Sequence, residues 1–380
     1  MKTAAVLASA ISLAAAFPQS LGRRAGNESI LVDEAPQYAR PYALRKGSGQ
    51  AVQVGSQIYR FSVTGNSSDG AFTLMQTNAA TGAGLGVLPH IHKTHYENFY
   101  CTKGRVQLWA ETDAAGESAR LLSQGDYGAV PHNTTHTFQI MDPDTQLTGV
   151  IQPGGFEALF IALASDTFDS AVGSEYIPAD ISDTTASDSS VISALEAFDV
   201  YAQLDFNPRR DLVNGSAGGA GNWHNGSNSL AADATTPNFV AKGWGPKYLN
   251  TDGGIYRIMS PLATGDQTAG NFTMGNMVMS RMMSNMTAET VSYPAAVAFQ
   301  LEEGQLVVDV DGYESVSLIQ GDVIFIPAET SFSYYADAAY TKVLYVTGGG
   351  EGCMDYELMA RAESWNYTTY PVEAGYKAKY

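Results

Sequence analysis

Hydrophobic positions in this chain occur in short runs separated by clusters of Gly, Asp, Asn and Pro. Clear examples are Phe99–Trp109, Gln305–Val310, Val323–Pro327 and Leu344–Thr347. Short apolar runs bounded by turn-forming residues predict β-strands. Many such strands in succession are typical of a sandwich or a small barrel. The pattern therefore predicts an all-β protein.

Two segments have a helical pattern instead. Residues 193–204 place Leu195 and Phe198 on one apolar face, and Pro208 follows as a stop signal. Residues 355–364, near the C-terminal end, predict a second helix. Helices are therefore expected as additions to a β fold.

The two halves of the chain resemble each other. The run Ile58–Phe61 recurs as Ile255–Ile258, and Phe72–Leu74 recurs as Phe272–Met274, so the period is about 200 residues. The turn residues repeat as well: Gly104 with Gly304, Gly125 with Gly321, and Pro131 with Pro327. We therefore expect two copies of one domain, at residues 25–169 and 230–380.

The segment between the copies, residues 170–229, is rich in Ser, Asp, Thr, Gly and Asn and contains the predicted helix of 193–204. We interpret it as a long, partly helical linker. A connection of this length inside a compact protein is usually a functional segment or a spacer. The sequence leaves both readings open: a lid over the mouth of the first domain, or a tether.

The N-terminal residues resemble a targeting segment. Lys2 precedes an apolar run from Ala4 to Ala16, and the dibasic pair Arg23-Arg24 follows. This order is typical of a secretory signal peptide with a possible propeptide, so residues 1–24 are excluded from the fold and the protein is expected to be secreted. Glycosylation sequons begin at Asn27, Asn66, Asn133, Asn214, Asn225, Asn271, Asn285 and Asn366.

Composition narrows the choice of partners. The chain has 380 residues with 21 Lys and Arg against 39 Asp and Glu, a net charge of −18. Such a charge repels phosphate backbones and anionic lipids, which argues against nucleic-acid and membrane partners. Two cysteines, Cys101 and Cys353, are too few for a disulfide scaffold, and the sequence leaves open whether they pair.

Three histidines and a glutamate are candidate ligands of a metal site. His90 and His92 are two positions apart and share a face if they lie on a strand, while Glu97 and His136 must come from neighbouring strands. Three imidazoles and one carboxylate are a first shell suited to a divalent transition metal. The alternative for any single histidine is a buried, hydrogen-bonded side chain. The joint spacing favours a metal site.

The second copy differs at these positions. Alignment of the two halves places Thr290, Ser292, Val297 and Phe332 where the first copy has its ligands. These side chains cannot form the same site. One metal per chain is the expectation.

The stretch Gly86–His136 resembles the two sequence motifs of cupins, and Asn133 replaces a glycine that is usual in the second motif. Cupins are small jelly-roll β-barrels, so the resemblance implies a bicupin. Over nearly the whole mature chain, the sequence is similar to the secreted fungal flavonol dioxygenases. That resemblance implies one copper ion in the N-terminal barrel, held by His90, His92, Glu97 and His136.

The same resemblance implies an apolar substrate cavity formed by Tyr59, Met75, Thr77, Phe99 and Phe138. Phe99 and Phe138 each follow a ligand by two residues, so both rings are expected on the ligand face of their strands. Core packing is the alternative for all five side chains, because a small barrel must fill its interior.

The implied reaction is O₂-dependent cleavage of the heterocyclic ring of a flavonol such as quercetin, giving a depside and carbon monoxide. Glu97 would take the proton of the enol hydroxyl and also ligate the metal. Two alternatives remain: a manganese-dependent bicupin acting on oxalate, and a cupin for storage or sugar binding without catalysis. The native metal, the preferred flavonol and the oligomeric state, including a possible homodimer, are left open.

Overall fold

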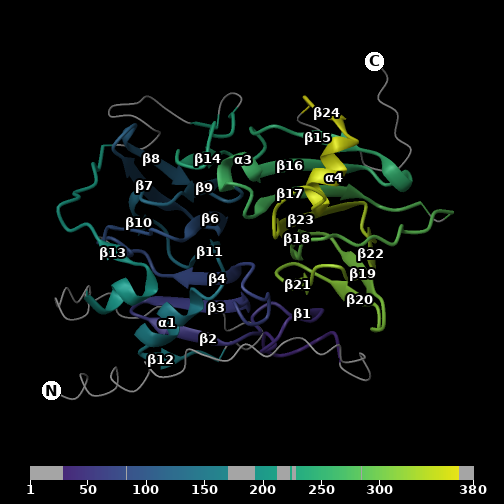
Figure 1. The fold of residues 1–380 in the computed structure, drawn as a ribbon, viewed down its shortest axis with the longest axis horizontal. Coiled ribbons are helices and arrows are strands. Elements are labelled where there is room, and N and C mark those ends of the chain that lie inside the picture. Colours follow the sequence, from purple (N-terminus) through teal and green to yellow (C-terminus); the bar gives the residue numbers. More distant parts are fainter. Residues whose placement is uncertain are drawn as a thin grey trace.

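The computed structural model describes residues 29–367, except 83, 170–192, 212–222, 225–227 and 284. Two β-rich lobes lie side by side, with the first half of the chain in one and the second half in the other (Figure 1). The predicted signal segment of residues 1–24 lies outside the described residues. The all-β prediction and the two-domain repeat agree with this architecture.

The first lobe consists of two sheets, in the orders β12-β2-β3-β4-β11-β6-β9-β14 and β13-β5-β10-β7-β8. The larger sheet contains β2 (Ala51–Val54), β3 (Gln57–Val63), β4 (Thr73–Ala79), β6 (Tyr96–Lys103), β9 (Tyr127–Val130), β11 (Thr145–Gln152), β12 (Asp166–Thr167) and β14 (Asn238–Val240). The smaller contains β5 (His90–Ile91), β7 (Val106–Thr112), β8 (Gly116–Leu122), β10 (Thr135–Ile140) and β13 (Tyr201–Ala202). One helix, α1 (Glu157–Leu163), follows β11.

The second lobe repeats this plan, with sheets in the orders β1-β21-β18-β23-β17-β16-β15-β24 and β20-β19-β22. Its larger sheet contains β1 (Tyr42–Leu44), β15 (Tyr248–Asn250), β16 (Arg257–Ala263), β17 (Thr273–Ser280), β18 (Val297–Glu303), β21 (Val323–Ile326), β23 (Tyr340–Thr347) and β24 (Glu363–Ser364). Its smaller sheet contains β19 (Leu306–Val310), β20 (Val316–Leu318) and β22 (Phe332–Ala336), and the helices are α3 (Gly265–Thr268) and α4 (Met354–Ala360). The sheets pack as an open jelly roll rather than a continuous barrel.

Each lobe exchanges an edge strand with the other. β1 precedes the first lobe in sequence but pairs with β21, with Tyr42 opposite Phe325. β14 follows the linker but pairs with β9, with Val240 opposite Tyr127. Both pairings cross the predicted boundaries at residues 25–169 and 230–380, which remain predictions.

A shared apolar core joins the lobes. It includes Tyr42 and Phe72 from the first half and Phe272 and Phe325 from the second, all fully buried. The Phe325 ring lies 5.7 Å from the Tyr42 ring and 6.1 Å from the Phe72 ring. Burial of large aromatic side chains is strongly stabilising, so the lobes are held as one body.

The register of the repeat differs from the one read in the sequence. Tyr59 pairs with Thr77 across β3 and β4, and Met259 pairs with Met277 across β16 and β17. Tyr59 therefore corresponds to Met259, three residues beyond the Tyr256 that the short motif suggested. Hairpin hydrogen bonding and a bulge at the same place in both copies set the register, which the four-residue similarity could not reveal.

The linker helix is shorter than predicted. Helical residues run from 193 to 198, and Asp199 then adopts a left-handed conformation (φ 63°). The chain continues as β13, so the prediction of helix up to Leu204 is wrong, and Leu204 is exposed. A residue at positive φ ends a helix because the helical hydrogen-bond pattern cannot continue through it. The prediction of a C-terminal helix over 355–364 is confirmed as α4 only up to Ala360, because Glu363–Ser364 form the strand β24.

The two cysteines do not form a bridge. Cys101 and Cys353 are both free and buried. Burial raises the pKa of the Cys101 thiol to about 12 and that of the Cys353 thiol to about 11. Neither thiol is therefore reactive at neutral pH.

Across the described part of the chain, we find no helix with the length and apolarity needed to span a membrane.

Candidate metal centre

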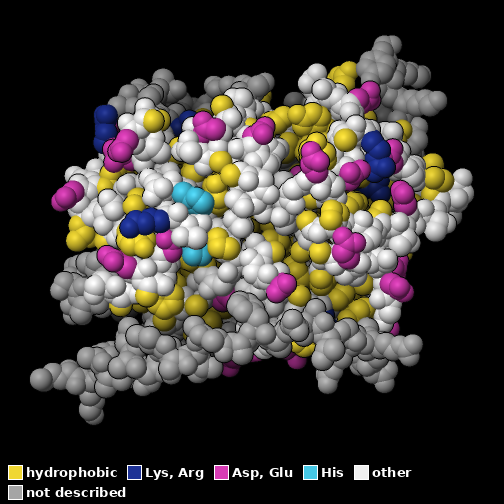
Figure 2. Space-filling model, in the orientation of Figure 1, with side chains coloured by type: hydrophobic (Ala, Val, Ile, Leu, Met, Phe, Trp, Pro, Cys, Tyr) yellow, Lys and Arg dark blue, Asp and Glu magenta, His cyan; other side chains and the backbone are white. Residues whose placement is uncertain are grey.

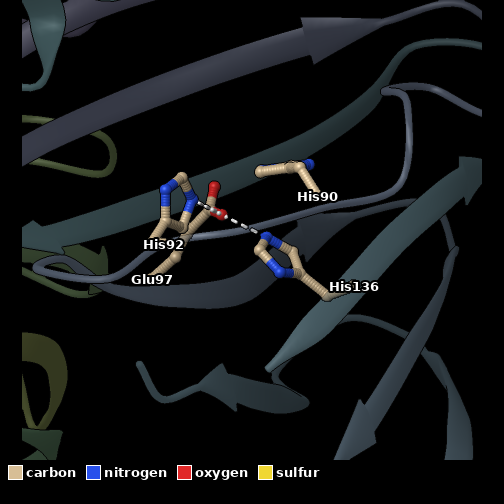
Figure 3. Close-up of side chains that lie close together, drawn as sticks. All are labelled: His90, His92, Glu97 and His136. Carbon is tan, nitrogen blue, oxygen red and sulfur yellow. Dashed lines mark hydrogen bonds and ion pairs between the residues drawn. The ribbon is translucent and has the colours of Figure 1, made fainter. Parts of the chain in front are cut away.

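The four predicted ligands converge in the first lobe. His90 lies on β5, Glu97 on β6 and His136 on β10, while His92 lies in the loop after β5. One potential ligand atom from each residue lies within 4.8 Å of the others, and all four residues are buried. Figure 3 shows His92 and His136 pointing toward Glu97, with His90 beside them.

Strand pairing explains how residues far apart in sequence meet. β10 pairs with β5 so that His136 lies opposite His90. Glu97 lies opposite Ile151 on β11 and Val130 on β9, in the facing sheet. The metal centre therefore lies between the two sheets of the lobe, with ligands from both.

Each histidine is oriented by a backbone carbonyl. The Nδ1 atoms lie 2.8 Å from the Leu88 carbonyl oxygen for His90, 2.8 Å from that of Asp199 for His92, and 3.0 Å from that of Thr134 for His136. A carbonyl that accepts from Nδ1–H turns Nε2 toward the cluster, where a bound metal would displace any proton on Nε2, as is usual for ligating histidines. The donor set and its orientation therefore fit a transition metal.

The carboxylate holds the cluster together. Glu97 Oε2 lies 2.9 Å from His136 Nε2 and 3.3 Å from His92 Nε2. Burial by itself raises the pKa of Glu97, but the hydrogen bonds from His136 and His92 outweigh it and hold the pKa below its usual value. Glu97 is therefore an anion at neutral pH, as a ligand must be.

The pKa values of two of the imidazoles are shifted in opposite directions. Burial lowers the pKa of His92, but its hydrogen bond to Glu97 outweighs this and raises the pKa. For His90, burial and the neighbouring His136 and His92 together lower the pKa well below its usual value. His90 is therefore neutral at pH 7, which is the protonation state that binds a metal.

The turn before His136 keeps its shape despite the missing glycine. Asn133 has φ 57°, a left-handed conformation that Asn tolerates better than most residues. Its backbone N–H donates to the carbonyl of His92 at 2.7 Å. The departure from the cupin motif at this position therefore leaves the ligand turn intact.

The second lobe has no such cluster among its described residues. Val291 forms a β-bridge with Phe332, as His90 does with His136 in the first lobe. The backbone carbonyl of Tyr293 accepts from the N–H of Glu329, as that of His92 accepts from the N–H of Asn133. Val291 and Tyr293 thus occupy the ligand positions, and the alignment to Thr290 and Ser292 was shifted by one residue. Compared with the first copy, the second copy has one extra residue before Val291 and one fewer between Val291 and Val297, which caused the shift. The prediction that the copy lacks these ligands still holds.

The five predicted pocket side chains are all buried in the first lobe. Tyr59, Met75, Thr77, Phe99 and Phe138 are each between 4% and 7% exposed. The Phe99 ring lies 6.4 Å from that of His136 and 5.8 Å from that of Phe138. Phe99 and Phe138 therefore flank the candidate metal centre.

Tyr59 and Met75 belong to a neighbouring apolar cluster. The Tyr59 ring stacks on Phe160 of α1 at 4.1 Å between ring centroids. Gly149 faces Met75 across β4 and β11, and a Cβ there would lie 3.0 Å from the Met75 methyl group. The apolar environment thus extends from the metal ligands toward α1. Phe160 and Gly149 have no spacing signal relative to the ligands, so the sequence did not identify them.

Three further histidines are outside the cluster. The His95 side chain is only 15% exposed, and its Nδ1 lies 2.8 Å from Asp199 Oδ2. His132 is partly buried against the Tyr96 ring, at 3.9 Å. His224 Nε2 lies 2.6 Å from Asp126 Oδ2.

Comparison with known proteins agrees with this geometry. No protein-family model matches the chain. The chain is 50% identical, over 349 residues, to quercetin 2,3-dioxygenase of Aspergillus japonicus, covering 91% of this chain and 99% of that protein. It is 32% identical over 130 residues to quercetin 2,3-dioxygenase of Bacillus subtilis, covering 34% and 36%.

Solved structures show the same fold at low identity. An oxalate decarboxylase mutant of Bacillus subtilis has a TM-score of 0.50 and 12% identity, covering 84% of this chain and 80% of that chain. Oxalate decarboxylase of Lactobacillus farciminis, in a formate complex, has a TM-score of 0.50 and 13% identity, covering 83% and 88%. Identity at this level shows the fold alone. The relationship to the Aspergillus protein extends over almost the full length of both sequences, and this chain belongs to the quercetin 2,3-dioxygenase family.

Proposed function

We propose that this chain is a copper-dependent flavonol dioxygenase that cleaves the heterocyclic ring of a flavonol such as quercetin with O₂, giving a depside and carbon monoxide. One observation carries the proposal: a complete three-His-one-Glu cluster lies beside Phe99 and Phe138 in a chain 50% identical to a quercetin 2,3-dioxygenase. The Irving–Williams order supports copper for such a donor set.

The metal, bound by the Nε2 atoms and Glu97, would supply a Lewis-acidic site for the deprotonated hydroxyl of the substrate. Glu97 is placed to receive that hydroxyl proton, because its carboxylate lies among the ligands, with Oε2 2.9 Å from His136 Nε2. Phe99 and Phe138 would orient a flat polyphenol and exclude water from the reacting carbon.

The proposal is tested by metal analysis together with turnover. Purified protein should contain close to one copper per chain, and quercetin absorbance should decay in air but not under nitrogen. Carbon monoxide should be released in proportion to quercetin consumed. Copper-loaded protein that leaves quercetin unchanged in air would refute the proposal.

The oxalate alternative gains no support from the solved structures. The two oxalate decarboxylases resemble this chain at 12% and 13% identity, a level that speaks to fold only. Oxalate turnover measured with manganese in the same preparation provides the comparison, and we expect none.

We also propose that the protein is a secreted glycoprotein. Five of the sequon asparagines are exposed: Asn66, Asn133, Asn271, Asn285 and Asn366. Asn27, Asn214 and Asn225 lie outside the described residues. Mass spectrometry of protein from a eukaryotic host should find glycan on exposed sequons and a mature N-terminus at or before Ala25. An uncleaved, unmodified chain would contradict this proposal.

A further inference from the structure

Part of the linker binds directly to the strand and loop that carry two of the metal ligands. β13 pairs with β5, with Ala202 opposite His90. Leu195 and Val200 are 6% and 4% exposed and pack in the apolar cluster that contains Tyr59 and Met75. The segment around Asp199 is therefore anchored on both sides, and Asp199 has a fixed position.

The Asp199 carboxylate binds the loop between two metal ligands. Its Oδ1 accepts from the backbone N–H of Lys93 at 3.0 Å, and its Oδ2 accepts from those of Thr94 and His95 at 2.8 and 2.9 Å. The His95 ring adds a fourth contact through Nδ1, at 2.8 Å from Oδ2. This loop joins His92 to Glu97, so one carboxylate fixes the segment that sets their spacing.

The same residue orients a ligand through its backbone. The carbonyl oxygen of Asp199 lies 2.8 Å from His92 Nδ1. The left-handed conformation of Asp199, with φ 63° and ψ 30°, allows its carbonyl and its carboxylate to face the ligand loop together. His90 and His136, in contrast, are oriented by carbonyls only two residues away in sequence.

We propose that Asp199 is a positioning residue of the metal centre: it holds His92 and the loop 93–95 so that His92 Nε2 and Glu97 meet at one metal. The inference rests on the proposed function only in requiring that a metal binds the four-residue cluster. It makes the docked linker part of the metal site, although none of the linker residues that the structure describes is among the ligands.

An anionic side chain is required for this role. Three backbone N–H groups and one imidazole converge on the two carboxylate oxygens, and a carboxylate can accept at every position. An amide has only one acceptor oxygen, so its NH₂ group would face a backbone N–H. Asp199→Asn should therefore loosen the loop while preserving size and a tolerated left-handed backbone.

The experiment compares copper binding by full-length wild type, Asp199→Asn and Asp199→Gly. Glycine accepts φ 63° and keeps the carbonyl that faces His92, but it removes the carboxylate. The control is Asp211→Asn, because Asp211 is another linker aspartate, in an exposed ion pair with Arg209. Metal-free protein is titrated with Cu²⁺ against a chelator, and the EPR spectrum of the bound ion is recorded. Near-UV circular dichroism verifies the fold of each variant before titration.

Both Asp199 variants should bind Cu²⁺ about 10–100-fold more weakly than wild type, the loss typical of substitutions that remove an outer-shell support of a metal site. Their EPR hyperfine splitting should differ from that of wild type, and Asp211→Asn should match wild type in both measurements. Equal affinity and identical spectra in folded Asp199 variants would overturn the inference. Wild type that binds Cu²⁺ but leaves quercetin unchanged would refute the proposed function while leaving the binding comparison valid.

Discussion

Replacing Glu97 with Gln separates the two roles assigned to this residue. Gln keeps the length of the side chain and one oxygen for the metal, but it removes the charge and the basic carboxylate. Glu97 is 8% exposed, and its Oε2 lies 2.9 Å from His136 Nε2 and 3.3 Å from His92 Nε2. Water therefore has little room to replace the lost carboxylate.

The expected loss of turnover follows from the missing base. Removal of a positioned general base costs about 10²–10⁴-fold in rate, which corresponds to about 3–5 kcal/mol of activation free energy. The metal-free variant should also lose about 1–3 kcal/mol of unfolding free energy, because a buried charge-assisted hydrogen-bond acceptor is weakened.

The assay is quercetin consumption in air, divided by copper bound per chain at saturating copper. Glu157→Gln is the matched control, because the Glu157 carboxylate accepts from Gly65 N–H at 2.9 Å and Thr73 Oγ1 at 2.6 Å and touches no metal ligand. It should lose stability but keep its turnover per copper. Unchanged turnover per bound copper in Glu97→Gln would show that Glu97 acts only as a ligand.

Three further predictions concern other parts of the first lobe and the thiols. His136→Ala should reduce bound metal from about one per chain to almost none while the far-UV circular dichroism spectrum is unchanged; retained stoichiometric metal would contradict the ligand assignment. Cys101 and Cys353 should not react with a thiol reagent in the native protein at pH 7, because burial raises both pKa values far above 7, and both should react after unfolding. Rapid labelling of the native protein would contradict this prediction. Gly86→Ala should lower kcat/KM for quercetin about tenfold or more, because a Cβ there would lie 2.4 Å from the Phe138 ring and displace it; unchanged kinetics would show that the ring position is immaterial.

Much of the fold could be predicted because it depends on local signals. Short apolar runs bounded by turn residues give the strands, and the second copy of the pattern gives the second lobe. The exchange of β1 and β14 between lobes has no such signal, since strands of three residues can pair with any free sheet edge. The prediction of a helix over 193–204 was wrong for a related reason. Asp199 leaves the helical conformation because its contacts with the ligand loop stabilise a left-handed backbone.

The metal ligands could be predicted because the spacing of His90, His92, Glu97 and His136 is specific. The groups that hold these ligands in place could not be predicted from the sequence. Asp199 lies 107 positions from His92, and only the folded linker brings the two together. A one-residue insertion before Val291 was also invisible, because nearby deletion restores the alignment at Val297. Sequence spacing thus locates atoms that bind the metal better than it locates groups that hold those atoms.

The exchanged edge strands make each lobe dependent on the other half of the chain. A fragment that ends in the linker would lack β14, leaving β9 with an unpaired edge, and the complementary fragment would lack β1 beside β21. A protease cut within the linker would therefore leave two pieces that stay associated, held by these pairings and by the core around Phe325. Such a nicked protein would migrate as one particle in gel filtration and as two bands after denaturation, and neither half is a suitable unit for separate expression.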